Sequence, residues 1–177
     1  MQFKNNSKQY GIVAILFHWL MAVVIIGLFF LGDYMVDLTY YDSWYVSAPN
    51  WHRSIGAISF LLLALRFIWR LKNIHPAGLG QMWENRLASY VHSLFYLLLL
   101  IIMISGYLIT TADGQAISVF NWFDIPATVY GFTNQEDIAG EIHYYLATGL
   151  ILLVILHALA AFKHHFINRD ATLRRML

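Results

Sequence analysis

Cysteine is absent from the 177-residue sequence. This absence excludes disulfide bonds, cysteine-ligated iron–sulfur clusters, zinc ribbons and the C-x-x-C-H motif that attaches c-type haem. Any metal or redox group that the chain binds must therefore be held by other ligands.

Charged residues are also scarce, at 12%, whereas hydrophobic residues make up 59% of the chain. The mean hydropathy of +0.57 lies well outside the range of soluble proteins. Apolar runs occur at about 11–32, 54–71, 87–110 and 142–162, and each is close to the ~20 residues that cross a bilayer as a helix. The first run is too long for the apolar core of a signal peptide, so we expect it to be retained. The sequence predicts an all-α integral membrane four-helix bundle, with residues 1–177 forming a single domain.

Lysine and arginine are missing from two of the three connections between these runs. The connections at about 33–51 and 111–141 hold eight acidic residues and no basic one, and ten of the eleven basic residues fall on the other side. Because basic loops stay in the cytoplasm, we expect both termini to be cytoplasmic. The net charge of +1 hides this asymmetry, which reflects topology and gives no reason to expect nucleic-acid binding.

Histidines occur inside the apolar runs, where an ionisable residue is a functional hypothesis by default. His143 and His157 are fourteen residues apart on the fourth run. Fourteen steps of about 100° return to nearly the same face of a helix and climb about 21 Å. His143 is therefore predicted to lie near the outer surface and His157 near the inner surface.

Two further histidines match these depths. His52 comes at the outer start of the second run, and His18 comes about two turns after the inner start of the first. Depth therefore pairs His52 with His143 and His18 with His157. Two such couples suit two low-spin haems, because an iron porphyrin that only transfers electrons needs both axial positions filled. The groups would be haem b, held without covalent attachment.

Two arginines are candidates to pair with the haem propionates. Arg66 follows His52 by fourteen residues on the same face, one layer further in. The alternative is that Arg66 extends its side chain to the lipid headgroups. Arg53, next to His52, could serve the outer haem in the same way.

A bare metal ion or a proton relay is the rival explanation for these histidines. A catalytic zinc site needs three protein ligands close together, whereas each predicted layer offers two. Intramembrane histidines also build transport pathways, so metal or proton transport stays open as the less favoured class.

Four segments together resemble one known family. FHWLM around His18, HRSIG around His52, VHSLFYLLLL around His92 and the ending LHALAAFKHHFINRDATLRRM are similar to the bacterial cytochrome b561 family, whose members are four-helix di-haem membrane cytochromes related to the cytochrome b subunits of hydrogenases and formate dehydrogenases. The resemblance covers essentially the whole chain and implies that the protein lies in a bacterial inner membrane.

The resemblance implies that His18 and His157 ligate one haem b and that His52 and His143 ligate the other. It also implies electron exchange with membrane quinones such as ubiquinone, and oxidation of superoxide by some members. The acidic outer loops would not steer an anion strongly, so a quinol or a periplasmic electron-transfer protein is the preferred partner there. No residue is assigned a catalytic role.

The remaining polar residues have open alternatives. His92 could be an alternative inner ligand, a propionate or quinone contact, or a hydrogen-bonded core residue, since its depth places it near His18 and His157. His164 is expected at the membrane surface or near a quinone headgroup. Asp124, with Trp122 and Phe123, could form a lid over the outer haem or a plain loop on lipid.

Overall fold

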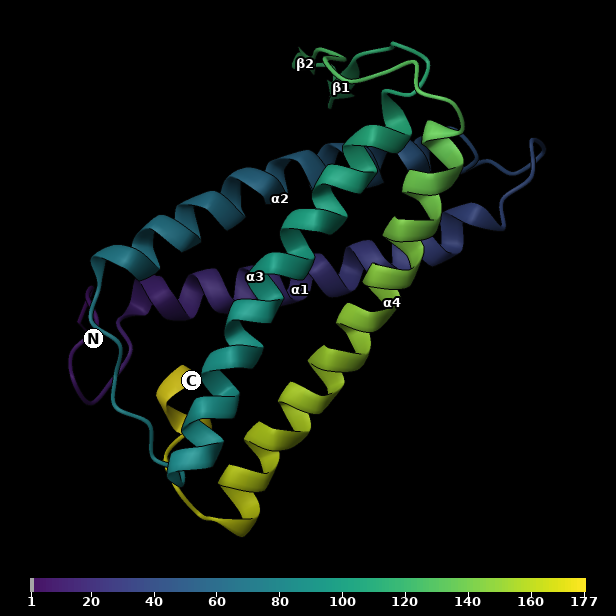
Figure 1. The fold of residues 1–177 in the computed structure, drawn as a ribbon. Helices are drawn as coiled ribbons and strands as arrows, with labels where there is room; N and C mark the ends of the chain where they lie inside the picture. The colour runs from purple at the N-terminus through teal and green to yellow at the C-terminus, as the bar shows by residue number, and fades with distance from the viewer. Residues whose placement is uncertain (1) are drawn as a thin grey trace.

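Four long helices dominate the computed structural model, which describes residues 2–177 (Figure 1). They are α1 (Ile12–Val36), α2 (Ser47–Lys72), α3 (Met82–Thr110) and α4 (Gln135–Phe162). A small antiparallel hairpin, β1 (Ile117–Val119) and β2 (Phe123–Ile125), interrupts the connection between α3 and α4. A π-helical turn at Lys163–Ile167 extends α4, and a 3-10 turn at Leu173–Met176 follows. The predicted all-α four-helix fold is confirmed.

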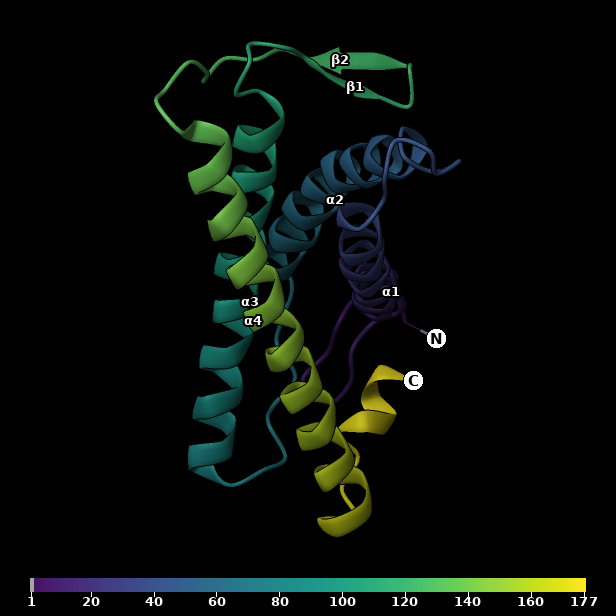
Figure 2. The same ribbon diagram turned by 90° about the vertical axis from the view of Figure 1, so that its right-hand side faces the viewer.

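The helices associate as two hairpins, α1 with α2 and α3 with α4, which are inclined to each other (Figures 1 and 2). The β hairpin and the α1–α2 connection lie at one end, called here the hairpin end. Both termini and the α2–α3 connection lie at the opposite end, called the termini end. Successive helices therefore run in opposite directions between the two ends, as expected for four successive membrane crossings.

Three helices begin earlier than the apolar runs. α2 starts at Ser47, with Pro49 in its first turn, where a missing N–H breaks no hydrogen bond. α3 starts with a capping box, in which Gln81 and Glu84 satisfy each other's backbone N–H groups. The first turn of α4 carries acidic residues, which the positive end of the helix dipole stabilises. The apolar runs thus located the right helices but missed their polar ends, because hydropathy reports only the part that suits lipid.

Only a small core lies at the centre of the bundle. Met21, Leu63, Leu99 and Leu150, one from each helix, form a single buried cluster. Most other large apolar side chains face outward, and all four helices are long and apolar enough to cross a membrane. Leu150 is seven residues from both His143 and His157, so this cluster lies between the two histidine levels of α4.

The β hairpin packs on the first turns of α2. Val119 is fully buried, and the Ser54 hydroxyl accepts a hydrogen bond of 3.0 Å from the Phe120 N–H. Phe120 and Asn121 form the turn with φ angles of 51° and 58°, a region that bulky residues rarely adopt. The sequence predicted no strand in this segment, where Asp124 now lies exposed on β2.

Candidate functional site

His52 on α2 and His143 on α4 lie near the hairpin end, and we call them the hairpin-end couple. Their ring centres are 6.1 Å apart, with planes at 66°. His18 on α1 and His157 on α4 form the termini-end couple, with ring centres 6.2 Å apart and planes at 57°. The structure therefore brings together the residues that depth along the helices had paired.

The surroundings of His143 fix its orientation. Its Nδ1 lies 2.9 Å from the Ile102 carbonyl oxygen and 3.2 Å from the Ser105 hydroxyl. Because a carbonyl oxygen can only accept, Nδ1 carries the proton and donates, which leaves a lone pair on Nε2 for a metal. A Cβ on Gly106 would come within 3.2 Å of the ring, so the absence of a side chain there makes room for His143.

His52 occupies a similarly tight position against α1. A Cβ on Gly32 would lie 3.1 Å from its Cε1 atom. Its Nδ1 is buried and has no hydrogen-bond partner among residues 2–177. The ring packs between α1 and α2 against Gly32, with the Leu28 backbone also within its reach.

A cavity of about 720 Å³ is lined by both residues of the hairpin-end couple. Its walls are mainly apolar, and include Phe29, Phe60 and Leu99, while Gly56 and Ala147 leave space between the helices. This volume falls in the range of roughly 300–1,000 Å³ found for small-molecule and cofactor sites.

The spacing of the rings provides a second test of fit. Two metal–nitrogen bonds of about 2 Å each place two imidazole ring centres about 6 Å apart when they ligate opposite sides of one metal. Both couples have this separation. The donors and the spacing of both couples, and the cavity at the hairpin end, thus fit a flat group held between two imidazoles.

Arg66 lies beside the termini-end couple. One of its guanidinium nitrogens is 3.4 Å from His18 Nδ1, and another is 3.8 Å from Met21 Sδ. Arg66 and Arg70 both lie over the ring of Tyr96, at 5.8 Å and 5.5 Å from its centre. Two cations therefore accompany this couple within the bundle.

His92 on α3 also lies at this level. Its ring centre is 5.6 Å from that of His157, which also contacts Phe95 at 5.5 Å. No group of three His, Cys, Asp or Glu within residues 2–177 is arranged to hold a bare metal ion.

Arg53 lines the hairpin-end cavity, but its hydrogen bonds point elsewhere. Its Nε donates to the Pro49 carbonyl at 3.3 Å, and its guanidinium also contacts Asn50 Oδ1. Arg66, by contrast, points directly at a histidine ring.

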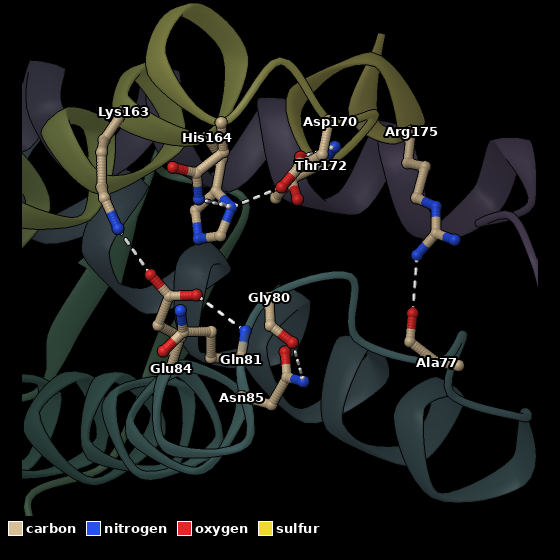
Figure 3. A network of polar contacts seen from close by, with 11 residues as sticks. Ala77, Gly80, Gln81, Glu84, Asn85, Lys163, His164, Asp170, Thr172 and Arg175 are labelled. Carbon is tan, nitrogen blue, oxygen red and sulfur yellow. Dashed lines mark hydrogen bonds and ion pairs between the residues drawn. The ribbon is translucent and has the colours of Figure 1, made fainter.

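The termini end is tied together by polar contacts (Figure 3). Lys163 pairs with Glu84 at 2.5 Å, and His164 pairs with Asp170 at 2.6 Å. Arg175 donates to the Ala77 carbonyl at 2.7 Å. Burial alone would raise the pKa of Asp170, but hydrogen bonds from Thr172 and His164 outweigh it and lower the pKa to about 2. His164 thus has a structural role. The three contacts, Lys163 with Glu84, His164 with Asp170 and Arg175 with Ala77, are called here the clasp.

Ser54 and Ser105 are site residues that sequence reasoning missed. Ser54, two residues after His52, anchors the hairpin, and Ser105 contacts His143. Both are buried. The sequence signal that could have identified them is a hydroxyl side chain within an apolar run.

The fold and the site define an integral membrane four-helix protein with two facing histidine couples. A family profile described as prokaryotic cytochrome b561 matches residues 9–177. The chain belongs to the prokaryotic cytochrome b561 family.

Individual relatives show the same likeness. The chain is 47% identical to cytochrome b561 homolog 2 of Escherichia coli K12, with 100% of this chain and 95% of the relative covered. It is 26% identical to cytochrome b561 homolog 1 of the same organism, over 77% of this chain and 78% of the relative. It is also 26% identical to the probable superoxide oxidase CybB of Yersinia pestis, over 96% of both chains.

Proposed function

We propose that the protein carries electrons across the bacterial inner membrane through two non-covalent haem b groups. His18 and His157 ligate one, and His52 and His143 ligate the other. The observation that supports this proposal best is the ring spacing of 6.2 Å and 6.1 Å in two couples at two levels of one bundle. Membership of the family supports haem b as the bound group.

The protein's own residues supply ligation and insulation. Bound haem supplies an iron centre that gains or loses one electron. Two imidazoles at each level would hold the iron, which would leave no open site for oxygen chemistry. The buried cluster around Leu99 and Leu150 keeps water from the space between the couples. Arg53 is the candidate to neutralise a propionate at the hairpin end, whereas the Arg66 guanidinium faces His18 at the termini end.

The chain forms one membrane domain over residues 1–177, with the termini end in the cytoplasm. Support for this orientation comes from the positive-inside rule, since ten of the eleven basic residues belong to segments at the termini end or adjoining it. The hairpin end then faces the periplasm. Quinol or quinone in the lipid is the proposed exchange partner, with a periplasmic electron-transfer protein as a further donor at the hairpin end.

Superoxide oxidation is the second candidate, because one relative is named a probable superoxide oxidase. The hairpin end carries the eight acidic residues of the two outer connections, accompanied by Arg53 alone among basic residues. A negative surface repels an anion, so we favour a quinol or a protein donor.

A reduced-minus-oxidised optical spectrum with haem quantified per chain tests the proposal. We expect two non-covalent haems with sharp low-spin bands that carbon monoxide does not change. His52→Ala and His143→Ala should each remove the same haem, and His75→Ala, in the α2–α3 connection, serves as the control. A colourless protein would favour metal or proton transport, and loss of different haems would refute the pairing.

Electron exchange with quinone needs its own test. Short-chain ubiquinol mixed with the oxidised protein should reduce the haem, and the optical spectrum follows the reduction. If no reduction follows, a protein donor replaces quinol in the proposal.

A further inference from the structure

The two couples differ in what faces their imidazole rings. At the hairpin end, His143 Nδ1 donates to the Ile102 carbonyl oxygen at 2.9 Å. Donation to an acceptor makes an imidazole a more electron-rich ligand, which stabilises the oxidised and more positive metal. This contact lowers the tendency of the hairpin-end site to take up an electron.

At the termini end, the neighbour of the ring is a cation. The Arg66 guanidinium, which remains charged in proteins, lies 3.4 Å from His18 Nδ1. When Nε2 binds a metal, Nδ1 carries the proton, so this contact places a charge beside the ring and is not a hydrogen bond. Within residues 2–177 no carboxylate is paired with Arg66, because Glu84 pairs with Lys163 and Asp170 contacts His164. A positive charge that is not neutralised attracts an added electron, and the attraction is strong where apolar side chains replace water.

Charges further from the rings act in the same direction. Arg70 lies over the Tyr96 ring together with Arg66, which adds a second cation at the termini-end level. At the hairpin end, Asp113 and Glu136 line the cavity that holds the couple, and the cation there, Arg53, is hydrogen-bonded to Asn50 and Pro49. Carboxylates near a redox site make reduction less favourable.

We propose that Arg66 is a positioning residue whose charge makes the termini-end couple the electron site of higher potential. An electron that enters at the hairpin end then comes to rest at the termini end. This inference rests on the proposed function, because it requires one haem iron in each couple. The transfer would take one electron from the hairpin-end iron and give one to the termini-end iron, with no bond or proton moved between the couples. A quinol, which releases its hydroxyl protons to water as it is oxidised, or a reduced protein would resupply the electron.

A redox titration of the purified full-length holoprotein, followed optically, tests the role of Arg66. In Arg66→Met, the higher of the two midpoint potentials should fall. The equilibrium constant for reduction of that haem should drop at least tenfold, which corresponds to about 59 mV for a one-electron couple. The lower midpoint should stay nearly constant. Arg66→Lys keeps the positive charge, so its higher midpoint potential should stay close to that of the wild-type protein.

Lys72→Met provides the matched control. Lys72 lies on the same helix and carries the same charge, but it is exposed at the termini end. Water and salt screen an exposed charge, so its removal should change the equilibrium by less than about threefold. An equal shift in Lys72→Met, or a shift of the lower midpoint in Arg66→Met, would overturn the proposal. A shift in Arg66→Lys as large as that in Arg66→Met would assign Arg66 a merely structural role.

Single-haem variants provide a measurement that needs no substitution of Arg66. His52→Ala should leave the termini-end haem, and His18→Ala should leave the hairpin-end haem. The former should titrate at the higher potential, and equal or reversed midpoints would refute the inference. Failure of the proposed function would look different, because the wild-type protein would then contain fewer than two haems per chain.

Discussion

Ser54 joins α2 to the β hairpin through its hydroxyl, which accepts a hydrogen bond of 3.0 Å from the Phe120 N–H and lies 3.4 Å from the Ser118 carbonyl. The hydroxyl therefore satisfies a backbone donor in a turn where Phe120 has an unfavourable positive φ. Because Ile117 and Ile125 of the hairpin line the cavity of the hairpin-end couple, this contact also fixes one wall of that cavity.

Ser54→Ala should destabilise the protein by about 1–3 kcal/mol, because it leaves a buried N–H without a partner. Thermal unfolding followed by the helical circular-dichroism signal measures the effect. Ser93→Ala is the control, since the exposed Ser93 hydroxyl bonds only the Ser89 carbonyl within its own helix. Equal unfolding temperatures for the two variants would contradict a role for Ser54 as an anchor.

Gly32→Ala should disturb the hairpin-end haem, whereas Gly27→Ala should not. A Cβ on Gly32 would lie 3.1 Å from His52 Cε1, but one on Gly27 would have no atom within 4 Å. Both changes replace glycine in the same helix, so their difference isolates the contact with the ring, which should cost about 1 kcal/mol. Electron paramagnetic resonance of the low-spin ferric signals reports the shift of the ligand. Identical spectra for the two variants would show that Gly32 is not needed for clearance.

His92→Phe should retain two haems per chain, because His18 and His157 already supply two axial nitrogens at the required spacing. The His92 ring lies only 5.6 Å from His157, so phenylalanine of similar shape should preserve the contact. Haem content per chain measures the outcome, with His18→Ala as the variant that loses one haem. Loss of a haem in His92→Phe would make His92 the ligand instead of His18.

The clasp at the termini end should weaken in acid. The pKa of Asp170 is about 2 in the folded chain, below its ordinary value of 3.8. A carboxylate with a lowered folded-state pKa stabilises the fold above its ordinary pKa, and this stabilisation is lost as the pH falls toward the folded value. The unfolding temperature of the wild-type protein should exceed that of Asp170→Asn above pH 3.8, and the difference should shrink toward pH 2. A difference that stays constant over this range would exclude the carboxylate as its source.

Much of the fold could be predicted because lipid imposes simple rules on a chain. The four apolar runs located α1 to α4, since a span must bury about 20 apolar residues in hydrocarbon. Their ends were less predictable, because Ser47 and Gln135 begin helical turns in polar sequence that hydropathy does not register. The strands at Ile117 and Phe123 were not predicted, since their pairing depends on contacts with α2 made through Ser54.

Depth along the helices determined from sequence alone which histidines could meet, because helical rise is fixed at about 1.5 Å per residue. His18 with His157 and His52 with His143 follow from that count. Tertiary structure alone decided how the rings are surrounded. Nothing in the spacing indicates that Ile102 accepts from His143 while Arg66 faces His18. These contacts depend on how α2 and α3 turn about their axes, which is set by side-chain packing between helices and leaves no periodic mark in the sequence.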